Sequence, residues 1–388
     1  MSGKSPLGGL TARAFLKRYW QKSPCLIRRA FPEFTPPISP DELAGLACET
    51  EVESRLVIRT HQRPGWSVHH GPFTKRDFHS LPEKNWTLLV QDTDKHLPVL
   101  AEFLAYFSFI PNWRIDDLMI SYAADGGSVG PHVDAYDVFL LQAQGRRRWH
   151  ISRKTHKPAR IPGLELKQVR AFKAQQSWVL KPGDMLYLPP GVAHHGVALG
   201  ECMTFSIGFR APSDAEMIAD LSGALIERLN KDVRYADPGL SPANADPGLI
   251  TNMTRAAIRR RIQRAQNLSA EETDEWFGRF ITESKPRLEP VPSRRKLTPA
   301  RLRKRLAACG KLQRDPAAIL AWYGAGSGKV KLFANGRCHV LPAHLSNLAR
   351  WLCRVRSYPA AQLEPWLLNR DTARLLTALY NAGVLYAS

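Results

Sequence analysis

The sequence predicts an α+β protein in which an antiparallel β-domain precedes a helical segment and a small C-terminal domain. Short β-rich runs separated by Gly and Pro turns fill residues 54–212. Amphipathic helical patterns follow, and helices then flank an Asn-Gly hairpin motif near the end of the chain. The 388 residues suit two or three domains. We expect them to span residues 1–212, 213–284 and 285–388.

Two helices are expected ahead of the β-rich runs, at residues 10–30 and 39–49. The second begins with Ser39 as its N-cap and Glu42 three positions later, the pattern of a capping box. A further apolar stretch, residues 97–111, contains Glu102 and two prolines and is shorter than the ~20 residues of a membrane span. This stretch therefore predicts a buried helix.

The β-rich runs have the spacing of an antiparallel sandwich or barrel. They are RLVIR (55–59), WTLLVQ (86–91), LMISYA (118–123), DVFLLQA (137–143), RWHIS (148–152), SWVLK (177–181), MLYLP (185–189) and MTFSIGF (203–209). We expect the chemistry of the protein to reside in this domain.

The helical segment, residues 213–284, is predicted to contain three helices, at about 213–230, 250–267 and 269–283. Ser213 with Glu216, and Ser269 with Glu272, have the spacing of capping boxes. Three such helices are too few for a strong core of their own. The segment is therefore expected either to pair between subunits or to pack on the β-domain.

The last section, residues 285–388, begins with a Pro-rich linker and resembles a winged-helix module. Helices are expected at 298–310, 315–326, 343–355 and 369–383, with a hairpin around Asn335-Gly336. The section carries 19 Lys and Arg against 4 Asp and Glu, so it holds +15 of the net charge of +20. Such a surface favours anionic partners such as RNA, or it is a solvated face that aids solubility.

Six cysteines lack the spacing of a disulfide framework or a zinc ribbon, and we expect free thiols. The N-terminus has no unbroken apolar stretch before a cleavage site, so no secretion signal is evident. Together these features predict a cytoplasmic protein.

The stretch GPHVDAYDVF, residues 130–139, places His132 and Asp134 two positions apart. Side chains at i and i+2 of a strand point to the same side, so both can reach one metal ion. This pair alone is a weak signal, because such a pair is expected by chance in a chain of this size.

A second motif, PGDMLYLPPGVAHHG, strengthens the metal hypothesis. Gly183, Pro189, Gly191 and His194 have the spacing of a strand, a turn and a histidine at the mouth of a double-stranded β-helix. Together with Gly126 and His132, about 60 residues earlier, this resembles the paired motifs of the cupin superfamily. His132, Asp134 and His194 would form a two-histidine, one-carboxylate triad with three open positions on Fe(II). The spacing selects His194 over His195, which we expect to pack beside the site.

An iron site with open positions needs a chelating co-substrate, and 2-oxoglutarate provides a keto acid and a distal carboxylate. The stretch GRRRW, residues 145–149, offers a cation for that carboxylate. Strand alternation allows either Arg147 or the pair Arg146 and Arg148 to point inward. An exposed basic strand is the alternative.

These motifs, with YWQKSPCLIRRAFP, EVESRLV, HGPF, NWTLLVQ, WRIDDLMISYA and SIGFRAP, resemble the JmjC-type 2-oxoglutarate oxygenases. Within them the chain looks like the bacterial ribosomal oxygenases that hydroxylate an arginine of large-subunit ribosomal protein sixteen. The resemblance implies Fe(II) at His132, Asp134 and His194, with O2 and 2-oxoglutarate as co-substrates. It also implies Arg147 at the distal carboxylate, with Ser121 and Ser206 lining the pocket. His195 departs from the family, whose members often have an acidic residue there.

The resemblance further implies a helical dimerisation segment, hence a homodimer, and a C-terminal winged helix. For a guanidinium substrate we expect Tyr136, Asp137 and Asp116 as contacts, with Asp117 as another candidate. Two alternatives stay open: hydroxylation of a histidine in a ribosomal protein, and a non-enzymatic cupin and winged-helix regulator that binds DNA. The complete triad beside Arg147 argues against the regulator.

Overall fold

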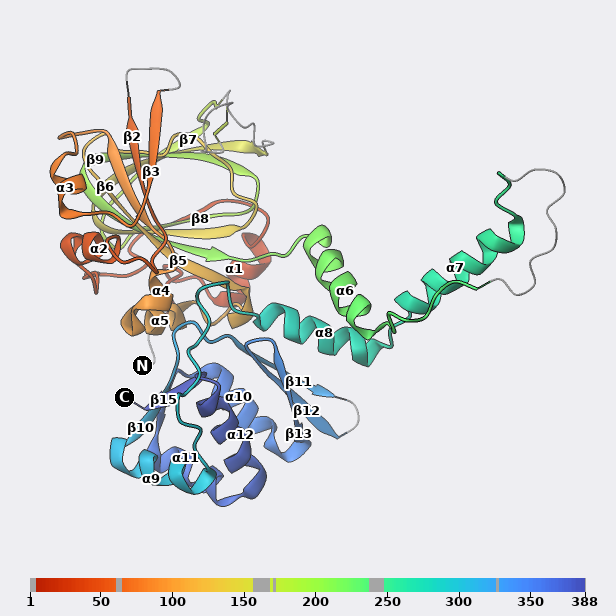
Figure 1. The fold of residues 1–388 in the computed structure, drawn as a ribbon. Coiled ribbons are helices and arrows are strands. Elements are labelled where there is room, and N and C mark those ends of the chain that lie inside the picture. The colour runs from red at the N-terminus through yellow and green to blue at the C-terminus, as the bar shows by residue number, and fades with distance from the viewer. Residues whose placement is uncertain are drawn as a thin grey trace. The chain divides into compact units, whose positions relative to one another are not determined.

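The computed structural model describes residues 5–60, 65–155, 168–169, 172–236, 248–325 and 328–387 (Figure 1). The chain divides into two compact units. The first comprises residues 1–211, 284–320 and 350–388, and the second comprises residues 212–283 and 321–349. The predicted division into 1–212, 213–284 and 285–388 stays a prediction.

A nine-stranded sheet dominates the first unit, and Figure 1 shows its strands curving around a common interior. Its strand order is β1-β8-β6-β9-β5-β4-β2-β3, and β7 pairs with β6 outside this path. The strands are β1 (Cys25–Ile27), β2 (Ser54–Arg59), β3 (Trp66–His70), β4 (Trp86–Val90), β5 (Ile115–Ala123), β6 (Asp137–Thr155), β7 (Gln176–Leu180), β8 (Met185–Leu188) and β9 (Val192–Phe209).

The long antiparallel pair of β6 and β9 forms the centre of this sheet. Their register runs from Asp137 opposite Phe209, through Ile151 opposite His194, to Thr155 opposite Val192, with bulges between. Aromatic side chains of both strands and of neighbouring elements are fully buried beneath them, among them Phe139, Phe205 and Phe209. This core fixes the sheet that carries the candidate site.

Short helices accompany the sheet in the first 114 residues: α1 (Ala12–Arg18), α2 (Pro40–Leu46), α3 (Lys75–His79), α4 (Thr93–His96), α5 (Pro98–Phe103), η1 (Leu104–Phe107) and η2 (Asn112–Arg114). The capping box predicted for α2 is present, because Ser39 and Glu42 bond each other's backbone N–H groups. Leu100, Phe103 and Leu104 are buried, as predicted for residues 97–111.

The predicted helix at residues 10–30 is wrong in its second half. Helix α1 ends at Arg18, and β1 pairs with β8 from Cys25 to Ile27. Pro24 lacks a backbone N–H and so cannot continue a helix. The buried Cys25 and Ile27 then alternate as a strand requires.

The second unit contains α6 (Asp214–Arg228), α7 (Asn252–Gln266), α8 (Ala270–Thr282), β12 (Lys329–Ala334), β13 (Arg337–Pro342), η3 (Ala343–Leu345) and most of β11 (Leu320–Ala325). Both predicted capping boxes, at Ser213 and Ser269, are present. Asn335 and Gly336 take φ values of 47° and 73° between β12 and β13, as the predicted hairpin turn requires.

The remaining elements are α9 (Pro299–Cys309), β10 (Lys311–Arg314), α10 (Ser346–Arg354), β14 (Ser357–Pro359), α11 (Ala360–Leu368), α12 (Arg370–Asn381) and β15 (Leu385–Ala387). Strands β14, β10 and β15 form a small sheet. The predicted helix at residues 315–326 is wrong, because residues 320–325 form β11 in the sheet with β12 and β13. No helix within the described ranges has the length and hydropathy needed to cross a bilayer.

Candidate metal centre and co-substrate pocket

The candidate metal centre lies where the segment between β5 and β6 meets the start of β9. The backbone N–H of His132 donates to the carbonyl of His194 at 3.0 Å, and the N–H of His194 donates back at 2.9 Å. The N–H of Gly191 donates to the carbonyl of Asp134 at 2.9 Å. These bonds hold the two sequence motifs against each other, so their side chains share one site.

Both imidazoles are oriented by backbone carbonyls. Nδ1 of His132 lies 2.9 Å from the carbonyl oxygen of Gly130, and Nδ1 of His194 lies 3.0 Å from that of Val192. A carbonyl oxygen only accepts, so each Nδ1 donates its proton in this contact, and Nε2 is the ring nitrogen that remains to face a metal. The local turns thus select the tautomer that a metal ligand needs.

The ligand atoms of His132, Asp134 and His194 all lie within 4.8 Å of one another. Nε2 of His194 is 3.5 Å from Oδ2 of Asp134, and the two imidazole centroids are 4.1 Å apart. Burial, with His132 as neighbour, lowers the pKa of His194 to about 4. The buried imidazole is therefore neutral near pH 7, which is the form that binds metals.

His195 points away from this group. Its ring lies beside His150, with centroids 6.1 Å apart, and beside Phe172. Neighbouring residues of a strand face opposite sides of a sheet, so the chain brings only one of the two histidines to the metal ligands. The residue that the spacing selected, His194, is the one that joins His132 and Asp134.

Arg147 is an arginine in the interior of the β-domain, with 3% of its surface exposed. Its Nη1 donates to Oγ of Ser121 at 3.2 Å and to Oγ1 of Thr204 at 3.4 Å, while its Nε has no hydrogen-bond partner in the part of the chain that the structure describes. No ion pair joins it to a carboxylate of the described residues. Burial lowers its pKa. A buried guanidinium that, among the described residues, bonds only hydroxyls has donors left to match an anionic group.

Trp149 connects this arginine to the metal ligands. The guanidinium carbon of Arg147 lies 5.3 Å from the Trp149 ring centroid, and that ring lies 5.8 Å from the ring of His194. Arg147 therefore points inward from β6. Its neighbour Arg148 is exposed, so the open choice between Arg147 and the flanking pair resolves to the single arginine.

Two residues of this pocket, Thr204 and Gly196, were not predicted from the sequence. Thr204 is buried opposite Ser121 in the β5–β9 register and bonds Arg147 directly. A Cβ added at Gly196 would come within 2.7 Å of the Trp149 ring and 2.9 Å of Nε of Arg147. Gly196 therefore leaves the space that both side chains occupy. Thr204 stands two positions before the predicted Ser206, which is also buried, so strand alternation could have identified it.

These residues fit the groups that the sequence implies. Two imidazoles and one carboxylate on one side form the donor set of non-haem Fe(II) oxygenases, with open positions opposite. The buried cation without a carboxylate partner among the described residues fits one end of a dicarboxylate. Arg147 and the triad are therefore complementary to a metal chelated by a keto acid with a distal carboxylate.

The predicted substrate contacts divide into two groups. Asp137 is fully buried, accepts from Tyr187 at 2.6 Å and Gln21 at 3.1 Å, and pairs with Arg114. Its carboxylate is thus occupied within the core. Tyr136 is 39% exposed, and it approaches Gly208 together with Asp117.

Asp116 and Asp117 begin β5 near Tyr136. Oδ1 of Asp116 is 3.1 Å from Nζ of Lys285. Burial raises the pKa of Asp117 to about 7, and Lys285 opposes this rise. Two carboxylates and a tyrosine therefore gather on one side of the site.

A double-stranded β-helix with this triad and a buried arginine defines a cupin-type, JmjC oxygenase. Family profiles agree: the JmjC domain matches residues 102–217, and the ROXA-like winged helix matches residues 263–386. The chain is 44% identical over 278 residues to the ribosomal protein uL16 3-hydroxylase of Escherichia coli strain K12, covering 72% of this chain and 73% of that protein.

Solved structures of Escherichia coli YcfD are similar over almost the whole chain. One superposes with a TM-score of 0.83 at 36% identity, covering 97% of this chain and 98% of that one. Another, in complex with cobalt and 2-oxoglutarate, has a TM-score of 0.79 at the same identity and coverage. The chain belongs to the JmjC-domain ribosomal oxygenases.

Family membership confirms the predicted fold class and the predicted enzyme class. The chain is an oxygenase of the 2-oxoglutarate-dependent, metal-binding JmjC type with a C-terminal winged helix. The alternative of a non-enzymatic regulator is therefore wrong. The assignment of roles to individual residues stays a prediction, as do the homodimer and the RNA contact.

Proposed function

We propose that this protein hydroxylates a side-chain carbon of an arginine in the large-subunit ribosomal protein uL16, using Fe(II), O2 and 2-oxoglutarate. One observation carries the proposal: three metal-type ligands within 4.8 Å of one another, near a buried arginine without a carboxylate partner among the described residues. The 44% identity to a uL16 3-hydroxylase supports the substrate protein.

In this proposal His132, Asp134 and His194 hold the iron, which supplies the oxidising chemistry when it is bound. Arg147, positioned by Ser121 and Thr204, binds the distal carboxylate of 2-oxoglutarate, and Ser206 lines the same pocket. The β6–β9 interior around Arg147 excludes water from the co-substrate. The share of the protein is binding, orientation and exclusion of water.

The substrate side of the site is assigned to Tyr136, Asp117 and Asp116. A guanidinium prefers a carboxylate and an aromatic face, and Asp117 and Tyr136 approach the same glycine, Gly208. Asp137 is not retained as a substrate contact, because its carboxylate bonds Tyr187, Gln21 and Arg114.

This arrangement favours arginine over the alternative target, a histidine. Asp116 is paired with Lys285, whereas Asp117 has no ion pair among the described residues, and a permanently charged guanidinium gains more from the Asp117 carboxylate than a neutral imidazole does. Succinate release with full-length uL16, followed by fragment mass spectrometry, tests the choice. We expect a mass increase of one oxygen on an arginine. An oxygen on a histidine supports the alternative, and unmodified uL16 with uncoupled turnover contradicts the proposed substrate.

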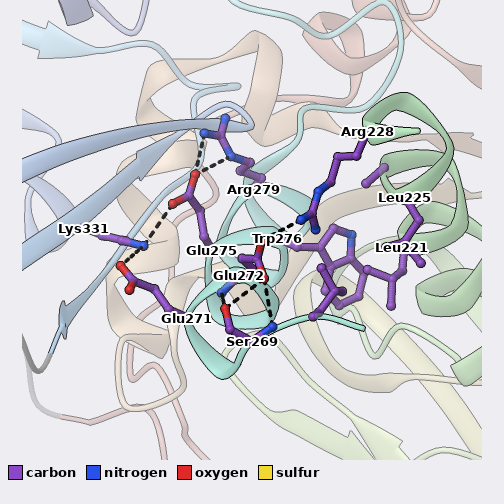
Figure 2. A pocket seen from close by; sticks show the side chains of 12 residues that line it. Leu221, Leu225, Arg228, Ser269, Glu271, Glu272, Glu275, Trp276, Arg279 and Lys331 are labelled. Carbon is purple, nitrogen blue, oxygen red and sulfur yellow. Dashed lines mark hydrogen bonds and ion pairs between the residues drawn. The ribbon is translucent and has the colours of Figure 1, made fainter. Parts of the chain in front are cut away.

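A homodimer is part of the proposal, and the surface between α6 and α8 supports it. Helix α6 buries none of its residues, and Ile218 and Ile226 are 61% and 58% exposed. Beside α6 lies a cavity of about 500 Å³ with Leu221, Leu225 and Trp276 along one wall (Figure 2). We propose that a second copy covers this apolar surface.

The charged rim of the same cavity is already paired. Nζ of Lys331 lies 2.9 Å from both Glu271 and Glu275, and Arg228 pairs with Glu272 at 2.6 Å (Figure 2). Because these basic and acidic side chains neutralise each other, the cavity is better suited to an apolar occupant than to a charged ligand. The helical face of another subunit has that character.

The basic residues of 285–388 are proposed to contact RNA that accompanies the ribosomal substrate. On α9, Arg301, Lys304 and Arg305 are exposed, and the helix contains no acidic residue. The catalytic chemistry and these partners are consistent with a cytoplasmic location, which we also propose.

A further inference from the structure

Four aspartates gather where the loop before α4 meets the start of β5. They are Asp92, Asp94, Asp116 and Asp117. Lys95 pairs with Asp94, while Lys285 lies 2.8 Å from Oδ1 of Asp92 and 3.1 Å from Oδ1 of Asp116. Two lysines thus compensate three of the four carboxylates.

Lys285 comes from a distant part of the chain. It follows α8 by three residues and lies within residues 263–386, the range of the winged-helix match, yet it reaches carboxylates of the β-domain. Asp92, its partner, is 8% exposed. The carboxylate end of this ion pair is therefore buried, while the Lys285 side chain is 36% exposed, so the pair is only partly screened by solvent.

Asp117 is the member of the group without an ion pair among the described residues. With its amide oriented to satisfy both neighbours, Gln91 donates to Asp117 at 3.0 Å and accepts from Arg55 at 2.7 Å. Its remaining oxygen, Oδ1, faces Gly208 near Tyr136. This carboxylate is the one that is free for a cationic substrate.

We propose that Lys285 is a positioning residue for the substrate: by compensating Asp92 and Asp116, it keeps the neighbouring Asp117 carboxylate charged and available to the arginine guanidinium. The inference rests on the proposed function, because it assumes that Asp117 contacts the substrate. Lys285 itself touches neither substrate nor metal.

The electrostatic reason follows from the groups that face Asp117. Asp92, Asp94 and Asp116 disfavour its charge, Lys285 favours it, and Arg55 acts through Gln91. Tyr136 faces it as a neutral phenol. Without Lys285, two further carboxylates lose their compensation, so Asp117 takes up a proton at higher pH than in the wild type.

The raised pKa of Asp117 determines in which direction substrate binding changes with pH. Burial raises the pKa of Asp117 to about 7 with Lys285 present, so substrate binding weakens as the pH falls through that value. Removing Lys285 raises the pKa further. The acidic limb of the KM profile for uL16 then moves to higher pH.

The test is the pH dependence of kcat and KM for uL16, measured with the full chain and saturating 2-oxoglutarate. For Lys285→Met we expect the acidic limb to move upward and KM at pH 7 to rise about three- to tenfold, with kcat little changed. Lys285→Arg retains the charge and should keep the wild-type profile. Equal profiles for Lys285→Met and the wild type overturn the inference.

Asp92→Asn provides a second variant, which should move the acidic limb of the KM profile in the opposite direction to Lys285→Met. Removing one repulsive carboxylate should move the limb to lower pH, and asparagine tolerates the left-handed backbone at position 92, where φ is 52°. This variant decides the matter if Lys285→Met fails to fold: a limb that does not move contradicts the inference.

Asp117→Asn separates this inference from the proposed function. We expect it to raise KM at every pH and to abolish the acidic limb. If Asp117→Asn keeps the wild-type KM, the assumed substrate contact is wrong. If Asp117→Asn raises KM while Lys285→Met keeps the wild-type profile, the substrate contact stands and the role of Lys285 is rejected.

Discussion

At the scale of single residues, the candidate site depends on how backbone contacts aim side chains. His132 and His194 are paired through their own backbone groups, and carbonyls two residues earlier orient both rings. The triad could be predicted from spacing because each motif contains its own turn glycine, Gly126 or Gly191, at φ values of 73° and 81°.

The pocket residue Gly196 was not predicted because the side chains that it contacts lie far away along the sequence. Gly196 directly follows the pair His194-His195. Because it has no side chain, it leaves the space that Arg147 and Trp149 occupy. Sequence alone does not reveal such a contact, since Trp149 is 47 positions away. Asp137 was predicted only as one of several carboxylates that could contact a guanidinium, and the sequence does not reveal that Tyr187 and Arg114 engage its side chain in the core.

Gly196→Ala tests the packing around Arg147. The added methyl group would meet the Trp149 ring at 2.7 Å and Nε of Arg147 at 2.9 Å, so both must shift. We expect KM for 2-oxoglutarate to rise about tenfold to a hundredfold, measured by succinate formation.

Gly45→Ala is the matched control, because no atom lies within 4 Å of a Cβ at that position of α2. It should keep the wild-type KM. If Gly196→Ala also keeps that value, the pocket is looser around Arg147 than the structure indicates.

At the scale of elements, strands rich in β-branched and aromatic residues were predictable, whereas several of the shortest strands were not. The strands around 118–123, 137–152 and 203–209 have enough β-branched and aromatic residues to be recognised. Strands of three or four residues, such as β1, β10, β14 and β15, depend on partners far along the chain. Residues 315–326 were mispredicted for a different reason, since pairing with the neighbouring β12 turns an apolar run into the six-residue strand β11.

Gly278→Ala tests the packing of α8 on β12. A Cβ at position 278 would lie within 2.6 Å of several atoms of the Phe333 ring, closer than real contacts allow. We expect the free energy of unfolding to fall by about 1–3 kcal/mol, seen as a lower midpoint in calorimetry of the full chain.

Gly223→Ala on α6 is the control, because a Cβ there meets nothing within 4 Å. Alanine is the better helix former, so this change should stabilise by roughly 0.4–1 kcal/mol. A midpoint for Gly278→Ala equal to that of Gly223→Ala contradicts the contact between α8 and Phe333.

At the scale of the whole molecule, the second unit contributes a surface that the chain alone leaves exposed. Leu225→Glu places a charge on the apolar wall of the cavity beside α8. We expect the dimer to dissociate, because the buried carboxylate would lack a partner. Light scattering coupled to size-exclusion chromatography measures the mass.

Ala219→Glu is the control for dimerisation, because residue 219 is exposed on α6 and does not line the cavity. It should keep the mass of a dimer. A wild-type protein that is monomeric at micromolar concentration contradicts the proposed role of this surface.

The basic C-terminal section gives a second prediction at this scale. Reversing Arg301, Lys304 and Arg305 to glutamate should weaken RNA binding and reduce its salt dependence, since fewer counterions are released. The measurement is fluorescence anisotropy of a labelled ribosomal RNA fragment over a salt series.

Reversal of Lys17 and Arg18, two exposed cations of α1 in the β-domain, is the control and should leave RNA binding unchanged. If the wild type does not bind RNA at low salt, the basic surface is a solvated face. The charge distribution predicted this surface, but it could not distinguish the two interpretations, because both have the same composition.

The most direct test of the central claim is calorimetric titration of 2-oxoglutarate into the cobalt-loaded protein without oxygen, comparing the wild type with Arg147→Met. We predict saturable binding by the wild type and binding about thirtyfold weaker or worse in the variant, since a buried charged pair is lost. Cobalt loading should be unchanged in Arg147→Met and lost in His194→Ala. Wild-type affinity for 2-oxoglutarate in Arg147→Met would contradict the assignment of this pocket.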